Sequence, residues 1–224
     1  MPDIEIVKLD QGGVNARILA KEAKVDFRRV EAASLKMPTR FTSAEGKRSF
    51  VRMFNTLQLN THFISVIART RLDHDDIGKI EAAIRAQMDA ATANLNKAID
   101  GAEALFKAHG ITSAASYDTV PLDVEVHVLS SASRRFLEVL GKLDQLMPLL
   151  QTLEIHEVIT AQAVDIQRAG LKRQVLELLR NVVPMGELLR DLQHPDTVLI
   201  DPSLHHYFRD VDDHLLDLHR LGEE

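Results

Sequence analysis

The stretch 76–109 places apolar residues at steps of three or four positions, and this pattern constrains the fold more than any other feature of the sequence. Its members are Ile77, Ile80, Ile84, Met88, Ala91, Leu95, Ala98, Ala102 and Leu105. The period matches one face of an α-helix, and from Met88 onward it approximates a heptad repeat with small residues. Gly110 follows where such a helix should stop. We therefore predict a long amphipathic helix that buries one face.

Apolar periodicity predicts further helices elsewhere in the chain. They cover about 44–70, 130–153, 155–182 and 203–221, with a short helix between Pro184 and Pro195. Thr42 or Ser43 can cap the first of them, Ser130 or Ser131 can cap the second, and Pro148 should kink or end that second helix. The chain has no Trp and few aromatic residues, so aliphatic side chains must fill the core. We predict a mainly α fold: an antiparallel bundle of four or five helices with a minor β element.

The β element is predicted from residues 120–128, where Val and Leu alternate with polar residues. A lone strand is not stable, so we expect it to pair with a strand at 4–9 or 24–31. Pro38 is expected to end any regular element that precedes it.

Charge is distributed unevenly along the chain. Residues 17–72 carry twelve Lys/Arg and four Asp/Glu, a net of +8, whereas residues 191–224 carry two and nine, a net of −7. We predict three parts: a flexible lead-in over 1–23, a basic strand-plus-helix segment over 24–72, and a helical bundle over 73–224 with one short strand. A basic segment on an acidic protein favours nucleic acid as the partner.

Seven cations form the candidate DNA-contacting set. They are Arg28, Arg29, Lys36, Arg40, Lys47, Arg48 and Arg52. Such side chains gain free energy by displacing counterions from phosphates. Arg48 and Arg52 share a helical face, and residues 24–28 or 35–37 could form a base-reading ribbon. In the competing interpretation, these cations are a solvated face that pairs with the acidic C-terminal helix.

A series of short motifs runs between residues 32 and 182. Its members are Leu35 to Arg40, Asp73 to Asp76, Ile80, Glu81, Val120 to Leu122, Arg135, Phe136, Asp144, Lys172, Arg173 and Arg180. In these motifs the chain resembles the AcaB-like proteins of integrating conjugative elements and conjugative plasmids. This resemblance implies a transcriptional regulator of conjugative transfer genes. It also implies a ribbon-helix-helix-like DNA-binding element and a dimer.

Signatures of catalysis are weak. The face of the 203–221 helix that holds His206, Asp210, Asp213, His214 and Asp217 has metal-ligand spacing, but a polar helix face explains it equally well. Glu154, His156 and Glu157 fit dipole partners at a helix start, Ser130 and Ser131 fit helix caps, and Gly12-Gly13 lacks a phosphate-loop frame. We expect no enzyme, no metal and no cofactor.

The remaining features bear on compartment and partners. The chain lacks Cys, has no visible secretory signal and no apolar run of the ~20 residues that span a bilayer, so we expect a cytoplasmic protein. The seam in 76–109 should pack in a helical hairpin against 131–153, or else form a dimer seam or a site for a protein partner. The function favoured by the sequence is a homodimeric regulator that binds double-stranded DNA. The alternative is a helical adaptor without DNA contact.

Overall fold

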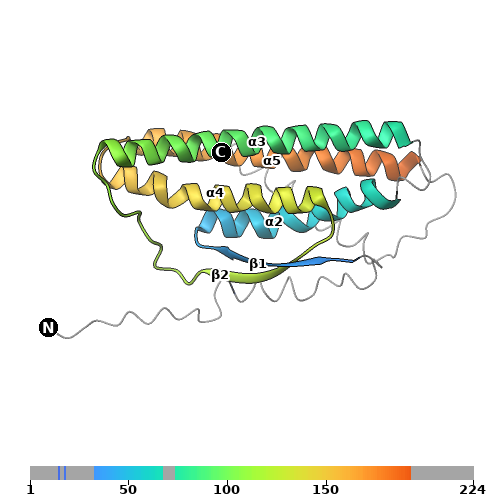
Figure 1. Cartoon of the computed structure of the whole chain (residues 1–224), viewed down its shortest axis with the longest axis horizontal. Coiled ribbons are helices and arrows are strands. Elements are labelled where there is room, and N and C mark those ends of the chain that lie inside the picture. Colours follow the sequence, from blue (N-terminus) through green and yellow to red (C-terminus); the bar gives the residue numbers. More distant parts are fainter. Residues whose placement is uncertain (1–14, 16–17, 19–32, 68–73, 193–224) are drawn as a thin grey trace, which may run out of the picture.

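The fold is a helical bundle with a two-stranded ribbon, as predicted (Figure 1). The computed structural model describes residues 15, 18, 33–67 and 74–192, with side chains as far as residue 184. In chain order the elements are β1 (Leu35–Phe41), α2 (Ala44–His62), the π-helix η2 (Phe63–Ile67), α3 (His74–Ala108), β2 (Leu122–Val128), α4 (Ser131–Ile155) and α5 (Ala161–Leu192). The strands expected at 4–9 and 24–31 and the helix expected at 203–221 lie outside the described residues.

The four helices α2–α5 pack side by side, but they do not alternate in direction. Asp89, in the first half of α3, is bonded to Arg135 at the start of α4. Ala115, just beyond α3, donates its N–H to the Thr152 hydroxyl near the end of α4, at 2.7 Å. The two helices therefore run parallel, because the connection through β2 returns along the length of the bundle (Figure 1). The seam of α3 packs against 131–153 as predicted, but the expected hairpin is wrong.

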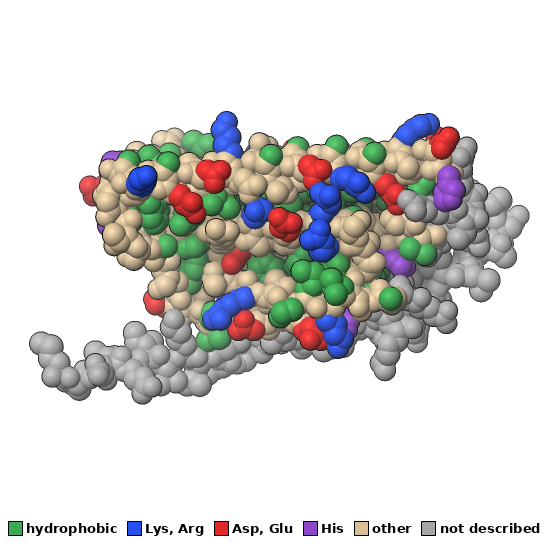
Figure 2. All heavy atoms as spheres, in the orientation of Figure 1, with side chains coloured by type: hydrophobic (Ala, Val, Ile, Leu, Met, Phe, Trp, Pro, Cys, Tyr) green, Lys and Arg blue, Asp and Glu red, His purple; other side chains and the backbone are tan. Residues whose placement is uncertain are grey.

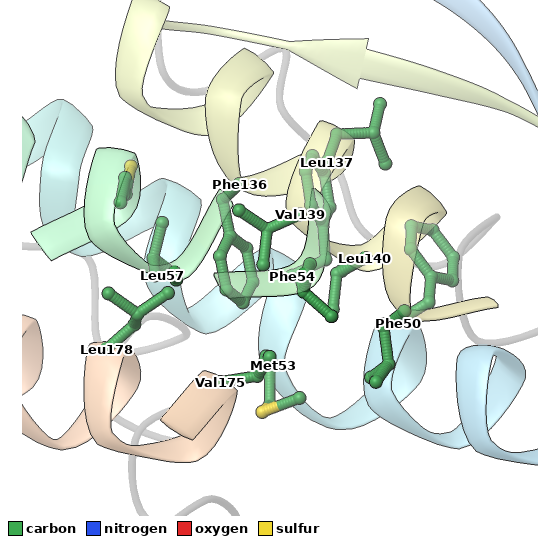
Figure 3. Packing of buried hydrophobic residues seen from close by; sticks show 14 of the residues in the cluster. Phe50, Met53, Phe54, Leu57, Phe136, Leu137, Val139, Leu140, Val175 and Leu178 are labelled. Carbon is green, nitrogen blue, oxygen red and sulfur yellow. The ribbon is translucent and has the colours of Figure 1, made fainter. Parts of the chain in front are cut away.

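Side chains from three helices meet in the centre of the core. Phe50, Phe54 and Leu57 of α2 face Phe136 and Leu140 of α4, and Val175 and Leu178 of α5 approach from the other side (Figure 3). Phe50 stacks against Phe54 with ring centroids 5.4 Å apart and is tilted against Phe41 at 5.1 Å. α2 is thus held by both its neighbours, which fixes the direction of its exposed face.

The ribbon differs from the sequence predictions in two ways. β2 pairs antiparallel with β1, a strand that was not among its expected partners, with Leu35 opposite Val128 and Phe41 opposite Leu122. Pro38 lies inside β1 and does not end it, because a strand at the edge of a sheet can leave the nitrogen of Pro on its open side. A ribbon-helix-helix dimer would pair strands from two chains, whereas this ribbon forms within one chain.

The helix ends follow local sequence signals. The Ser43 hydroxyl accepts the Gly46 N–H at 2.9 Å, and the Ser130 hydroxyl accepts the Ser133 N–H at 3.1 Å, so both predicted caps are confirmed. Gly110 adopts a positive φ of 65° after α3, as a glycine stop requires. The first helix changes to a π-helix at Phe63 and does not continue as α-helix to 70.

Proline does not end either of the last two helices. α4 continues through Pro148 to Ile155. One turn after the proline, the Thr152 hydroxyl donates to the Pro148 carbonyl at 2.7 Å. α5 begins at Ala161 instead of 155 and runs through Pro184 to Leu192, so the separate short helix is not formed. Near the start of α5, Val164 is buried and Ile166 is exposed.

None of the described helices combines the length and the apolar character that a membrane-spanning helix needs.

Candidate nucleic-acid interface

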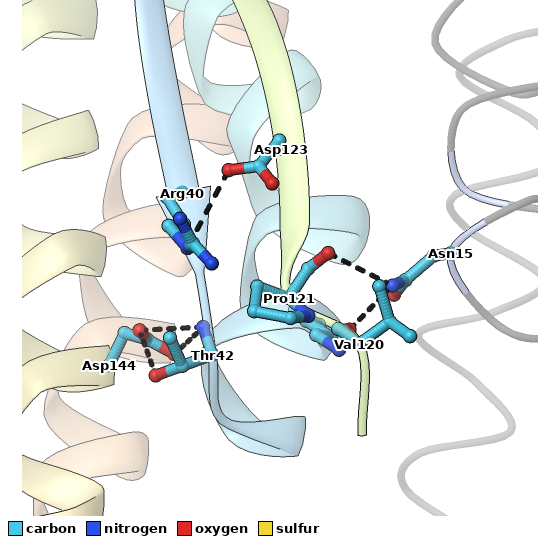
Figure 4. Close-up of polar contacts among 8 residues, drawn as sticks. Asn15, Arg40, Thr42, Val120, Pro121, Asp123 and Asp144 are labelled. Carbon is cyan, nitrogen blue, oxygen red and sulfur yellow. Dashed lines mark hydrogen bonds and ion pairs between the residues drawn. The ribbon is translucent and has the colours of Figure 1, made fainter. Parts of the chain in front are cut away.

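Two of the seven candidate cations lie on the outer face of the ribbon, and both have acidic partners on β2. The Nζ of Lys36 is 3.1 Å from the Glu125 carboxylate, and the Nε of Arg40 is 3.7 Å from that of Asp123 (Figure 4 shows the second pair). All four side chains are more than half exposed, so each pair contributes little to stability and can exchange for another partner. The described ribbon face is nevertheless charge-balanced rather than basic.

Lys47 is not available to a phosphate. It is only 5 % exposed, and its Nζ donates to the Val120 carbonyl at 2.6 Å. The side-chain amide of Asn15 donates to the same carbonyl at 2.7 Å. Lys47 therefore connects α2 to the segment that enters β2. Its role in the described part of the chain is structural.

Arg48 and Arg52 are exposed on the outward face of α2. Neither has an ion-pair or hydrogen-bond partner among the described residues. Their spacing of four positions puts both guanidinium groups on one side of the helix, as the sequence predicts. Arg28 and Arg29, the other two members of the set, lie outside the described residues.

The corner between β1 and α2 is fixed by a buried carboxylate on α4. Asp144 accepts hydrogen bonds from the Thr42 N–H at 2.9 Å and the Thr42 hydroxyl at 3.0 Å (Figure 4). It also accepts the Ser43 N–H at 2.7 Å and the Ser43 hydroxyl at 2.6 Å. Four donors offset the cost of burying one charge. This anchor sets where the first turn of α2 lies, and with it Arg48 and Arg52. This role of Asp144 was not predicted from the sequence, although an acidic residue inside the apolar stripe of α4 is a signal for it.

Gly46 lets α2 approach α4 closely at this corner because it has no side chain. A Cβ at this position would lie 2.2 Å from Asp144 Oδ1. Any side chain would therefore push the carboxylate away from the Thr42 and Ser43 donors. The glycine is required by close packing, since its backbone is helical.

Tyr117 reports the electrostatics of the same corner. Burial raises the pKa of its phenol, and the negative charges of Glu45 and Asp144 raise it further, while Arg168 opposes them. The loop after α3 therefore lies close enough to sense charges from α2, α4 and α5. The negative groups favour a protonated, neutral Tyr117 at this position.

The described residues give little support to a metal site, to acid–base chemistry at Glu154, His156 and Glu157, or to a docking face on α3. No group of three His, Asp or Glu in the described part could hold a metal ion, and the metal-like face at 206–217 lies outside it. Glu154 belongs to the last turn of α4, and His156 and Glu157 form the following turn, so the cluster is at a helix end and not at a helix start. The seam of α3 is used within the chain, so its interpretation as a protein-docking face loses its basis.

Figure 2 shows cations and anions interspersed over one face of the bundle and ribbon. Lys142 and Glu138 lie 3.9 Å apart along α4, and Arg135 pairs with Asp89. Such a mixed face has no net field of one sign to attract a polyanion. Arg48 and Arg52 stand out among the described candidate cations because neither forms an ion pair with an acidic side chain in the described part of the chain.

Comparison with known proteins identifies the fold. No protein-family model matches the chain, and no curated protein is significantly similar in sequence. Among solved structures, the chain is similar to selenomethionine-containing AcaB from uropathogenic E. coli, with a TM-score of 0.68 over 73% of this chain and 84% of that one. The fold is AcaB-like. The sequences are 22% identical, so the likeness to AcaB establishes the architecture alone.

Proposed function

We propose that the chain is a DNA-binding regulator of conjugative transfer genes and that it contacts double-stranded DNA through α2. The AcaB-like fold supports the resemblance that first indicated this role. The observation that carries the proposal is the exposure of Arg48 and Arg52 on one face of α2, without a partner among the described residues. The Asp144 anchor holds that face in a defined position.

The geometry supports a contact with two phosphates. Four residues of α-helix advance about 6 Å, so both guanidinium groups can reach phosphates of one strand. Each neutralised phosphate contributes about −0.9 to the slope of log affinity against log salt. Arg48 and Arg52 together should therefore contribute about −1.8, and further cations such as Arg28 and Arg29 would add to this value.

A salt series on duplex DNA from its own operon tests the proposal. Affinity should fall steeply with salt, and R48Q/R52Q should reduce the magnitude of the slope by about 1.8. The matched control is K97Q/K107Q, which removes two exposed cations from α3, a helix that packs against α4 and α5. Absence of binding at low salt, or an equal loss in both variants, would contradict a contact through α2.

The ribbon provides the second arm of the experiment. D123N/E125Q removes the two carboxylates that pair with Arg40 and Lys36. If DNA contacts α2 alone, this variant should keep the wild-type slope. If it instead makes the slope more negative by about 1.8, the ribbon cations contact phosphate once they are released, and the interface extends over β1.

A homodimer is part of the proposal, and light scattering of the purified chain measures it.

The adaptor alternative gains one observation from the structure: three of the seven candidate cations are paired or buried within the chain. A folded protein that does not bind duplex DNA at low salt would favour the adaptor.

A further inference from the structure

A pocket of about 300 Å³ opens between α2, α3 and α4, and neither Arg48 nor Arg52 lines it. Its described walls come from the end of α2 and η2, from the first half of α3 and from the start of α4. The volume lies at the small end of the range for ligand pockets. No step of the proposed DNA contact uses it.

The floor of the pocket is apolar and its rim is charged. Ile64, Ile84 and Met88 line it and are at most 4 % exposed, so they are held in place by the core. Arg85 of α3 and Arg135 of α4 line it as well, from opposite helices. Two guanidinium groups over an apolar floor match a molecule that has an anionic head and an apolar body.

The two arginines differ in whether they already have an ion-pair partner. Arg135 is bonded to Asp89, a residue outside the lining, and this ion pair holds it in position. Arg85 is exposed and has no partner among the described residues. Glu81 also lines the pocket but is engaged in an interaction of its own. Among the described charged residues at the rim, the one without a partner is therefore the cation Arg85.

The start of α4 adds donors to the same wall. Ser131 and Ala132 line the pocket, and they are the first two residues of a 25-residue helix. The Ser130 hydroxyl caps Ser133 and leaves the N–H groups of Ser131 and Ala132 without a described acceptor. Free N–H groups at this end of a helix favour an anion. They reinforce the preference that the two arginines set.

We propose that this pocket binds a small organic anion, a carboxylate or a phosphate monoester with a short apolar body. The apolar body would lie against the more accessible apolar lining residues, Val66 and Leu129, above the buried Ile64, Ile84 and Met88. The anionic head would bond to Arg85 and to the N–H groups of Ser131 and Ala132. This inference is independent of DNA binding.

Titration of the full chain by ¹H–¹⁵N spectroscopy tests the site with four probes: hexanoate, hexyl phosphate, 1-hexanol and inorganic phosphate. At least one of the two amphipathic anions should shift the Ser131 and Ala132 amides saturably. 1-Hexanol should bind about tenfold more weakly than that anion because it lacks the charge. The anion with the tighter binding identifies the head group, and inorganic phosphate measures the contribution of the head alone.

Two variants assign the contacts. R85Q should raise the Kd of the preferred anion about tenfold, whereas K107Q, the matched loss of one cation on α3, should leave it unchanged. S131P removes one N–H donor at a position where helices accept proline, after an extended Ser130 with ψ 163°. It should also weaken the anion and leave 1-hexanol unaffected. Circular dichroism confirms that each variant is folded.

Three results would overturn the proposal. The first is the lack of a saturable shift with either anion at tens of millimolar. The second is equal affinity for hexanoate, hexyl phosphate and 1-hexanol, which would show an apolar crevice without anion recognition. The third is an equal effect of R85Q and K107Q, which would show that overall charge and not the pocket determines binding.

Discussion

Asp144 Oδ1 accepts the Ser43 N–H at 2.7 Å and the Ser43 hydroxyl at 2.6 Å. The same hydroxyl accepts the Gly46 N–H and so caps α2. The cap of one helix is therefore held by a carboxylate from another helix, 101 positions later in the chain. This connection joins β1, α2 and α4 at a single point and sets the position of the basic face of α2.

Replacing Asp144 with Asn should destabilise the fold by about 2–3 kcal/mol, because an amide removes the charge and turns an NH₂ toward N–H and O–H donors. Urea unfolding measures the change. D165N, at an exposed position of α5, is the control and should change stability by less than about 0.5 kcal/mol. Equal stability of D144N and wild type would show that Asp144 does not anchor this corner.

Gly46→Ala should lower stability, although alanine is the better helix former. The new Cβ would meet Asp144 Oδ1 at 2.2 Å, and displacing that carboxylate breaks its hydrogen bonds. Gly101→Ala is the matched control, because nothing lies within 4 Å of a Cβ there. We expect G101A to gain about 0.5–1 kcal/mol and G46A to lose at least about 1 kcal/mol in thermal or urea unfolding. A gain in both variants would contradict the close approach at Gly46.

Lys47→Met should cost about 1–2 kcal/mol, because the Val120 carbonyl loses a charged donor while the apolar part of the side chain is kept. The salt slope for DNA should stay at the wild-type value, because the Nζ of Lys47 is buried. Both measurements can be made on one preparation. A slope reduced by about 0.9 would show instead that Lys47 reaches a phosphate.

His62 should make stability depend on pH. Burial lowers its pKa below the usual 6.5, so the unfolded chain takes up the proton more readily than the folded one. Its contribution is complete above pH 6.5 and is lost as the pH falls through 6.5 toward the lower folded value. Urea unfolding from about pH 8 to about pH 5 should show this decline.

The control for His62 is a comparison of two variants. H62Q should flatten the dependence on pH, whereas H74Q, at an exposed position, should retain the wild-type curve. A constant offset in the stability of H62Q does not bear on this test, because the slope against pH and not the absolute stability is the decisive quantity. Parallel curves for H62Q and wild type would exclude His62 as the titrating group.

Local patterns predicted most of the elements. The period of 76–109 located α3, the alternation of 120–128 located β2, and Ser43 and Ser130 marked the starts of α2 and α4. Each of these signals depends on neighbours within a few positions, where propensity and capping act. The start of α5 was misplaced because Val158 and Ile159 continue the apolar pattern through a turn in which Glu157 has a φ of 56°.

The candidate site was predictable only in part. Arg48 and Arg52 lie on one exposed face, as their spacing required. Lys47, one position earlier, is buried because the helix turns it toward the Val120 carbonyl. Lys36 and Arg40 are paired because the register places them near Glu125 and Asp123. A count of basic residues contains none of this information.

The sequence by itself determined that the chain forms amphipathic helices with a small β element, because periodicity and caps are local properties. The tertiary structure alone decided that β1 pairs with β2, that α3 and α4 run parallel, and which cations stay exposed. These outcomes depend on contacts between residues far apart in the chain, such as Ser43 with Asp144 and Lys47 with Val120. Their free energy is gained only when the whole bundle packs, so no local pattern encodes them.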